Sequence, residues 1–209
     1  MPDERTYLRD PEAIYRESRR LIEAEADLAG LADDARQLAV RLIHACGMTD
    51  LVGDLDVSPG AIGLGRGALE AGAAVLCDVE MVARGIVAER LPAANRIICT
   101  LNSARVPTLA KRHRTTRSAA AVDLWGDDLE GAVVAIGNAP TALFHLLEVV
   151  ADGAPRPALV IGMPVGFVGA AEAKRALAAS GLAHITVHGR RGGSALAAAA
   201  VNGLLGGIG

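Results

Sequence analysis

The sequence predicts an α/β fold, a three-layer αβα arrangement with a largely parallel sheet, plus N-terminal helices. Two observations predict it. Five short apolar runs alternate along the chain with stretches of helical spacing, the order typical of a parallel sheet covered by helices on both faces. Hydrophobic residues make up 51% of the 209 residues, enough for a core that buries about 70% of the unfolded surface. Because no linker or repeat divides the chain, we expect a single domain spanning residues 1–209.

Two helices are expected before the first of these runs. Asp10 is a good capping residue, and Pro11 suits the first helical position. A second helix is expected from Asp33 or Asp34 to Gly47, because glycine adopts the left-handed conformation common at helix C-termini. These helices would cover an edge of the sheet or form a surface for a partner.

The five apolar runs are expected to be strands buried on both faces. They lie at 73–78, 96–101, 132–137, 158–163 and 184–189. Helices are expected between and after them at 79–87, 141–150, 170–179 and 194–205. These patterns do not predict the order of the strands in the sheet.

Two of the expected strands run into loops rich in glycine and proline, one beginning with Asn138 and one at 164–169. Parallel sheets usually bind ligands beyond the carboxyl ends of their strands, and a helix N-terminus presents backbone N–H groups to an anion. The alternative is that these residues only form turns. From their loop positions, Asn138 and Gly193 are expected to bind a ligand.

The charge distribution argues against nucleic acid as a partner. The formal net charge is −3, and the basic residues are scattered except at 111–117. Two Phe, two Tyr and one Trp offer few surfaces on which bases could stack. A small acidic ligand is compatible with this charge.

The three cysteines, Cys46, Cys77 and Cys99, lack the spacing of a zinc or redox site and the density of a disulfide framework. They are expected to be reduced, buried thiols. The charged residues at 3–5 and the absence of a long apolar run argue against a signal peptide and a membrane span. We therefore expect a cytoplasmic protein with no membrane partner.

Several catalytic motifs are missing from the sequence. It contains no P-loop, no H-E-x-x-H and no G-x-S-x-G, so phosphoryl transfer, zinc hydrolysis and serine hydrolysis have no motif support. The glycines at 63–67 resemble part of a dinucleotide-binding fingerprint, but they follow a helix start at Ser58 and Pro59 rather than a strand. No pair of histidines has convincing metal-ligand spacing.

His44 is the first candidate for a catalytic residue. It lies in the last turn of the second expected helix, where the negative end of the helix dipole favours imidazolium and so suits a general acid. The alternative is a capping or packed histidine, which position alone favours. Weaker candidates are His113, His145, His184 and His188.

Hydroxyl-bearing residues supply further candidates. Residues 115–118 place three hydroxyls and the Arg117 guanidinium before an Ala-rich run, a helix start at which Arg117 could bind a carboxylate bidentately. N-capping explains these hydroxyls equally well. Ser18 lies in the middle of the first expected helix, where its hydroxyl either bonds to a backbone carbonyl or faces another polar group.

Seven segments together resemble the precorrin-8X methylmutase family. The two longest, AIGNAPTALF at 135–144 and GMPVGFVGAAE at 162–172, are the most specific. The others are IHACGM at 43–48, VLCDVEM at 75–81, CTL at 99–101, TRSAAA at 116–121 and RGGSALAAAAVN at 191–202. The resemblance covers nearly the whole chain.

The resemblance implies an isomerase of cobalamin biosynthesis that moves a methyl group from C-11 to C-12 of precorrin-8X and gives hydrogenobyrinic acid. It implies that His44 protonates or deprotonates this macrocycle, and that Ser18, Arg117 and Ser118 contact it. The implied substrate carries several acetate and propionate groups, which Arg117 and backbone N–H groups would suit. The resemblance also implies no redox cofactor, no metal, and a homodimer with the site near the subunit interface.

Two alternatives stay open at this point. The first is a cobalt-precorrin-8 methylmutase of the anaerobic branch, because the quoted segments do not separate the two substrates. The second is a corrinoid carrier that binds the product without turning the substrate over.

Overall fold

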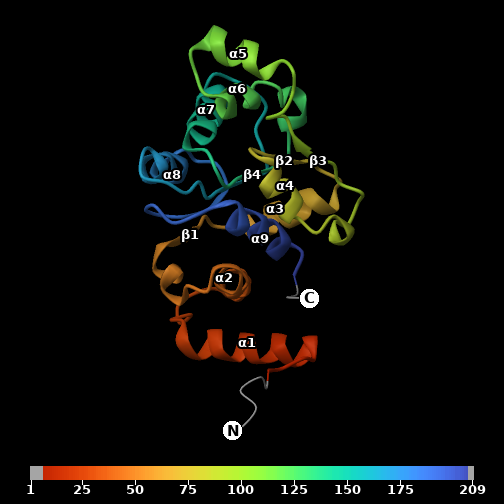
Figure 1. The fold of residues 1–209 in the computed structure, drawn as a ribbon, viewed down its shortest axis with the longest axis vertical. Helices are drawn as coiled ribbons and strands as arrows, with labels where there is room; N and C mark the ends of the chain where they lie inside the picture. Colours follow the sequence, from red (N-terminus) through yellow and green to blue (C-terminus); the bar gives the residue numbers. More distant parts are fainter. Residues whose placement is uncertain (1–6, 207–209) are drawn as a thin grey trace.

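The computed structural model describes residues 7–206 and confirms an α/β fold, with a sheet of six strands within that range (Figure 1). The strands are β1 (Leu55–Val57), β2 (Val75–Cys77), β3 (Ile97–Cys99), β4 (Val133–Ile136), β5 (Leu159–Gly162) and β6 (His184–Val187). The α-helices are α1 (Pro11–Glu25), α2 (Asp33–Cys46), α3 (Ala61–Glu70), α4 (Glu80–Gly85), α5 (Val106–His113), α6 (Arg117–Val122), α7 (Pro140–Ala151), α8 (Ala170–Ala179) and α9 (Ser194–Leu204). Short 3₁₀ helices are η1 (Thr49–Asp54), η2 (Ala88–Arg90) and η3 (Gly126–Leu129). Residues 3–5, part of the argument against a signal peptide, lie outside the described range.

The sheet has the strand order β1-β6-β5-β4-β2-β3. Neighbouring strands are parallel except β1 and β6, which are antiparallel. The five expected strands are confirmed, but β3 is half-buried rather than buried on both faces, because it lies at the edge of the sheet. The sequence does not predict β1, because it is three residues long, half-buried and interrupted by Asp56. The chain adds β3 on one side of β2 and then β4 on the other, so the strand order reverses between β2 and β4.

Each face of the sheet has its own core, because alternate strand residues point to opposite faces. Val75 and Val133 pack with α2, α3, α4 and α9, whereas Leu76 and Val134 pack with α7, α8 and the end of α6 (Figure 1). The expected three-layer arrangement is confirmed. The glycines at 63–67 lie inside α3 rather than in the turn between β1 and α3, so they form no dinucleotide fingerprint.

The N-terminal helices lie beyond α9, rather than covering an edge of the sheet (Figure 1). Helix α2 packs on α9, where a Cβ at Gly203 would lie 2.8 Å from the Leu38 side chain. Helix α1 packs on α2 through a small core that includes Ile22. The remaining surface of α1 exposes Ile14 and Leu21, so α1 keeps an apolar face open.

All three cysteines are free thiols, but only Cys77 is buried as expected, while Cys46 and Cys99 are half-buried. Cys99 ends β3, which is an edge strand and pairs with β2 on one side only. Within residues 7–206, every helix is too short or too polar to span a bilayer.

Candidate active site

His44 lies in the last turn of α2 and contacts α1. Its Nδ1 is 2.8 Å from the hydroxyl oxygen of Ser18, a hydrogen bond in which either atom can donate. The ring of Tyr15 stacks on the imidazole, with the ring centroids 5.4 Å apart and the planes at 15°. The Ser18 hydroxyl therefore faces a polar side chain from another helix.

Local sequence features place these side chains. The Asp10 side chain accepts a hydrogen bond from the Ala13 N–H and caps α1, in which Tyr15 and Ser18 lie on one face. Gly47 ends α2 in the left-handed conformation, with a φ of 71°. The imidazole beside this end is exposed. Because Nδ1 is held by Ser18, Nε2 is the ring nitrogen that can exchange a proton with a ligand.

Asp78 fills the place at the sheet edge where a ligand anion was expected. It follows β2 and is 2% exposed. Its carboxylate accepts hydrogen bonds from the backbone N–H groups of residues 137–139, at 3.0, 2.9 and 2.9 Å. The expectation that the loop after β4 offers these N–H groups to a substrate is therefore wrong. Asn138 can still contact a ligand through its side chain, which is exposed.

Burial raises the pKa of the Asp78 carboxyl, while the three backbone N–H groups act in the opposite direction. Because β2 and β4 are neighbours where the strand order reverses, Asp78 closes the crevice in which a parallel sheet usually binds its ligand. Sequence reasoning missed Asp78. An aspartate directly after a buried apolar strand is the signal that could have indicated it.

The loops after β4, β5 and β6 lie against one another. A Cβ at Gly137 would lie 2.7 Å from the backbone at the start of α9, and a Cβ at Gly192 would overlap the carbonyl of Met163. The Gly193 N–H donates to the same carbonyl at 2.8 Å. The structure therefore brings the loop containing Asn138 close to Gly193.

Arg117 and Ser118 lie in the first turn of α6, beside this edge of the sheet. The Thr116 side chain caps α6, and its hydroxyl oxygen is 2.8 Å from that of Thr141 in the first turn of α7. The exposed Arg117 donates to the carbonyl of Leu101, just after β3, at 3.2 Å. These contacts place Arg117 and Ser118 near the loop after β4.

One chain does not bring all the sequence-predicted residues together. Ser18 and His44 belong to α1 and α2, on the side of the sheet covered by α9. Arg117 and Ser118 belong to α6, on the side covered by α7 (Figure 1). The loops after β4, β5 and β6 lie at the carboxyl edge between these two groups.

The loop before α9 is tied to the segment that follows the His44 helix. The Arg191 guanidinium bonds to Asp50 at 2.8 Å and also to Asp54, both in η1. From α8, the fully buried Lys174 donates to the Arg191 carbonyl at 2.6 Å. Burial lowers the pKa of Lys174 to about 8, although the charge of Asp54 acts in the opposite direction. These contacts hold the edge of the sheet in a defined position relative to α2.

Histidines outside this candidate site also contact carboxylates. His145 is 2.6 Å from Asp123 and 3.3 Å from Glu148. Burial alone would lower the pKa of His145, but the bonds to the two carboxylates outweigh it and raise the pKa. His188 is 2.9 Å from Asp56 of β1. Across residues 7–206, no three His, Cys, Asp or Glu side chains are grouped as ligands of a metal ion.

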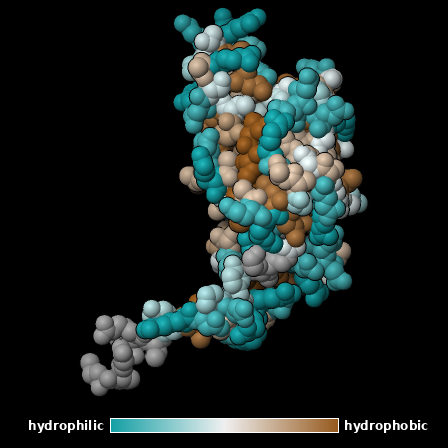
Figure 2. Space-filling model, turned by 90° about the vertical axis from the view of Figure 1, so that its right-hand side faces the viewer, coloured by the Kyte–Doolittle hydropathy of each residue, from teal (hydrophilic) through white to brown (hydrophobic). Residues whose placement is uncertain are grey.

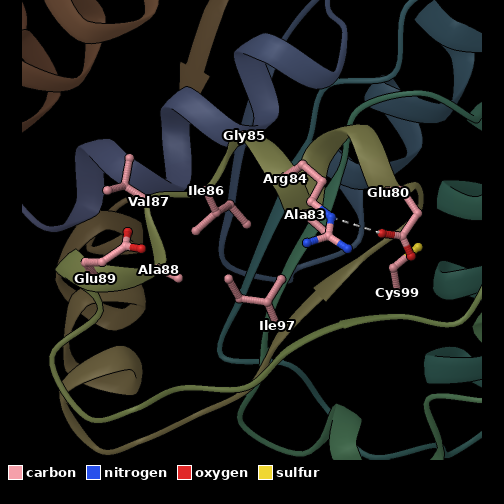
Figure 3. Close-up of a pocket in the computed structure, with 10 residues that line it drawn as sticks. All are labelled: Glu80, Ala83, Arg84, Gly85, Ile86, Val87, Ala88, Glu89, Ile97 and Cys99. Carbon is pink, nitrogen blue, oxygen red and sulfur yellow. Dashed lines mark ion pairs between the residues drawn. The ribbon is translucent and has the colours of Figure 1, made fainter.

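A cavity of about 620 Å³ lies between α4, η2 and β3 (Figure 3). On the side of the molecule shown in Figure 2, apolar residues gather in a band between hydrophilic ones. Ile86 and Ile97 line the cavity together with Glu80, Arg84 and Glu89. Two carboxylates against one guanidinium make its lining net negative, which disfavours a polycarboxylate ligand. None of the sequence-predicted site residues lines this cavity.

Comparisons with known proteins agree with the resemblance found in the sequence. The family model described as precorrin-8X methylmutase matches residues 13–206. The chain is 62% identical over 200 residues to the precorrin-8X methylmutase of Pseudomonas aeruginosa, covering 95% of this chain and 96% of the relative. It is 36% identical over 193 residues to the cobalt-precorrin-8 methylmutase of Priestia megaterium, covering 92% and 86%. The solved structure of precorrin-8X methylmutase from Thermus thermophilus matches with a TM-score of 0.84 at 39% identity, covering 92% of this chain and 96% of that chain.

Proposed function

The chain belongs to the precorrin-8X methylmutase family, and from this premise we propose that it is an isomerase that moves a methyl group from C-11 to C-12 of precorrin-8X, giving hydrogenobyrinic acid. The hydrogen bond between Ser18 and His44 is the observation that carries the proposal. It orients an exposed imidazole in the position that the resemblance gives to the acid–base group. Moving a methyl group within one molecule leaves the composition of that molecule unchanged. The protein therefore has to bind and orient the substrate and exchange protons with it.

In the proposed mechanism, His44 exchanges a proton with the macrocycle through Nε2. Ser18 bonds to Nδ1, and Tyr15 stacks on the ring, so the imidazole is held in one orientation. A proton gained or lost by a conjugated macrocycle changes the electron density at the carbon that loses the methyl group. General acid–base catalysis of this kind typically contributes about 10² to 10⁴-fold to the rate.

The substrate's carboxylates are proposed to bind at the carboxyl edge of the sheet. Arg117 provides a guanidinium, Ser118 a hydroxyl and Asn138 an amide, all suited to carboxylate oxygens. Gly193 acts differently, because its N–H already donates to Met163. Its lack of a side chain lets the ligand approach the backbone.

A homodimer is proposed to complete the site. Because α6 and the α1–α2 pair lie on opposite sides of the sheet, Arg117 and Ser118 of one protomer would face Ser18 and His44 of its partner. The apolar residues exposed on α1 offer a surface for the partner or for the flat face of the macrocycle. The proposed location of this enzyme is the cytoplasm.

The cobalt-containing substrate is not favoured, because identity is 62% to the relative named for precorrin-8X and 36% to the relative named for cobalt-precorrin-8. A carrier without turnover is also not favoured. A carrier would not require an imidazole whose Nδ1 is held by another side chain while the ring stays exposed.

Turnover of purified precorrin-8X, followed by its visible spectrum, tests the proposed reaction. Wild type is expected to form hydrogenobyrinic acid, and His44→Ala to be slower by about 10² to 10⁴-fold. Ser18→Ala should retain more activity, because His44 keeps both nitrogens. His113→Ala is the matched control, since His113 is a partly exposed histidine of α5, and it should turn over like wild type.

Each other result has a defined meaning. Binding without conversion by wild type would support the carrier, and conversion of only the cobalt-loaded substrate would support the cobalt enzyme. Full activity in His44→Ala would contradict the role of this histidine.

Mixing two variants that are each expected to lose activity tests the shared site. When His44→Ala and Arg117→Ala protomers exchange, a dimer with one of each keeps one site intact if the two residues come from different protomers. Random mixing at equal concentration should then restore about one quarter of the wild-type activity. If both residues act within one protomer, no activity returns.

A further inference from the structure

The loop after β5 exposes apolar side chains at the carboxyl edge of the sheet. We name residues 164–168 the β5 tip. Within it, Val165, Phe167 and Val168 are 47%, 83% and 89% exposed, and Phe167 is one of only two phenylalanines in the chain. Several apolar side chains exposed together are a usual mark of an interaction site.

The β5 tip is tied to its neighbours although its apolar side chains are exposed. The Gly166 N–H donates to the Arg190 carbonyl at 3.2 Å, and Pro164 is buried. Just before the tip, Met163 packs so closely on Gly192 that a Cβ would not fit. A loop held in place loses little conformational freedom when a ligand binds. The exposed side chains are therefore presented in a defined arrangement.

A cation lies beside this apolar surface. The exposed Arg190 guanidinium is 5.0 Å from the centre of the Phe167 ring. An apolar surface with a guanidinium at its margin suits a ligand that has a flat apolar face and carboxylates at its rim. A macrocycle bearing acetate and propionate groups combines both features.

We propose that the β5 tip is a further substrate-binding surface, in which Phe167 and Val168 contact the face of the macrocycle and Arg190 binds one of its carboxylates. This inference rests on the proposed function for the identity of the ligand. It assigns Phe167, Val168 and Arg190 to binding and leaves proton transfer to His44.

The position of the β5 tip fits this role, because it lies between the two groups of candidate residues. On one side, Met163 contacts Gly193, which is close to the loop containing Asn138. On the other side, Arg191 is bonded to Asp50, which follows the His44 helix. A macrocycle lying on the tip would be adjacent to Gly193 and to the loop containing Asn138, and the proposed dimer would bring the acid–base and carboxylate-binding groups of two protomers to it. The cavity beside β3 has no comparable feature, because its lining is net negative.

Equilibrium binding of hydrogenobyrinic acid and of its methyl ester tests the inference. The variants are Phe167→Ala and Arg190→Gln. Phe167→Ala should weaken binding of both ligands by about tenfold, because apolar contact with the macrocycle is lost. Arg190→Gln should weaken binding of the acid by about fivefold or more and leave the ester unchanged, because only the acid carries carboxylates.

Two matched controls use the same chemistry elsewhere on the surface. Met81→Ala removes an apolar side chain of α4 that is 72% exposed, and Arg175→Gln removes a guanidinium of α8 that pairs with Glu172. Both should bind like wild type. Urea unfolding should show that all four variants fold, since each changed side chain is exposed.

Unchanged affinity in Phe167→Ala, or no binding by wild type, would overturn the inference. An equal loss of acid and ester binding in Arg190→Gln would overturn the carboxylate contact. Dissociation of a dimer by Phe167→Ala, seen by sedimentation, would make the tip a subunit contact instead. Because binding of the product is measured without turnover, the tip can be confirmed even if wild type fails to convert precorrin-8X.

Discussion

Replacement of Asp78 by alanine should destabilise the protein strongly, because one buried carboxylate accepts three backbone hydrogen bonds. Asp78→Ala leaves the N–H groups of residues 137–139 without their acceptor. A buried donor left unpaired costs about 1 to 3 kcal/mol. Burial raises the pKa of Asp78. The cost of burying its charge therefore offsets part of the stabilisation that the three hydrogen bonds provide. The expected loss in the free energy of unfolding is therefore about 3 to 5 kcal/mol.

Asp78→Asn should cost less, about 1 to 2 kcal/mol, because one amide oxygen can still accept the two bonds now made by Oδ2. Asp10→Ala is the control at an exposed helix start, where the aspartate accepts one N–H bond, and it should cost about 1 kcal/mol. Urea unfolding followed by circular dichroism measures all three differences.

The reasoning would be refuted if Asp78→Ala cost no more than Asp10→Ala. That result would mean that water or a shift of the loop replaces the carboxylate. If the loop does lose its position, Asp78→Ala should also weaken binding of hydrogenobyrinic acid, measured below the temperature at which the variant begins to unfold, because Asn138 belongs to this loop.

Three further predictions concern pH and packing. Although burial opposes it, the bonds to Asp123 and Glu148 raise the pKa of His145. The stabilisation by protonated His145 is therefore full below the unfolded pKa and is lost as pH rises through the higher folded pKa. The difference in unfolding free energy between wild type and His145→Gln, followed against pH, measures this loss. Burial lowers the pKa of Lys174 from 10.5 to about 8. The unfolded chain binds this proton more tightly, so wild type should gain stability relative to Lys174→Met as pH rises between those values, and a flat difference would contradict the burial argument. Gly192→Ala should cost about 1 to 3 kcal/mol in urea unfolding, because the new Cβ meets the Met163 carbonyl. Gly53→Ala, with open space at its Cβ, should change stability by less than about 0.5 kcal/mol.

The elements that the sequence predicts best are those whose pattern is local. Four of the five apolar runs became strands buried on both faces, whereas β3, at the edge of the sheet, is only half-buried. Helix α1 begins after the expected capping residue Asp10, and α2 ends at the expected Gly47. The strand β1 was missed because three residues with an aspartate in the middle carry no periodic signal. Its partner β6, more than 120 residues later, supplies the hydrogen bonds that make it a strand.

The residues of the candidate site could also be predicted in part from local sequence, whereas their arrangement could not. The sequence by itself determined the family resemblance and predicted His44 and Ser18 as site residues, because both depend on short local stretches of sequence. Only the tertiary structure decided that these two side chains, 26 residues apart, bond to each other. It also decided that Asp78 closes the crevice between β2 and β4, and that Arg117 lies on the other side of the sheet from His44. These facts depend on strand order and helix packing, which distant parts of the chain determine together and which no local pattern encodes.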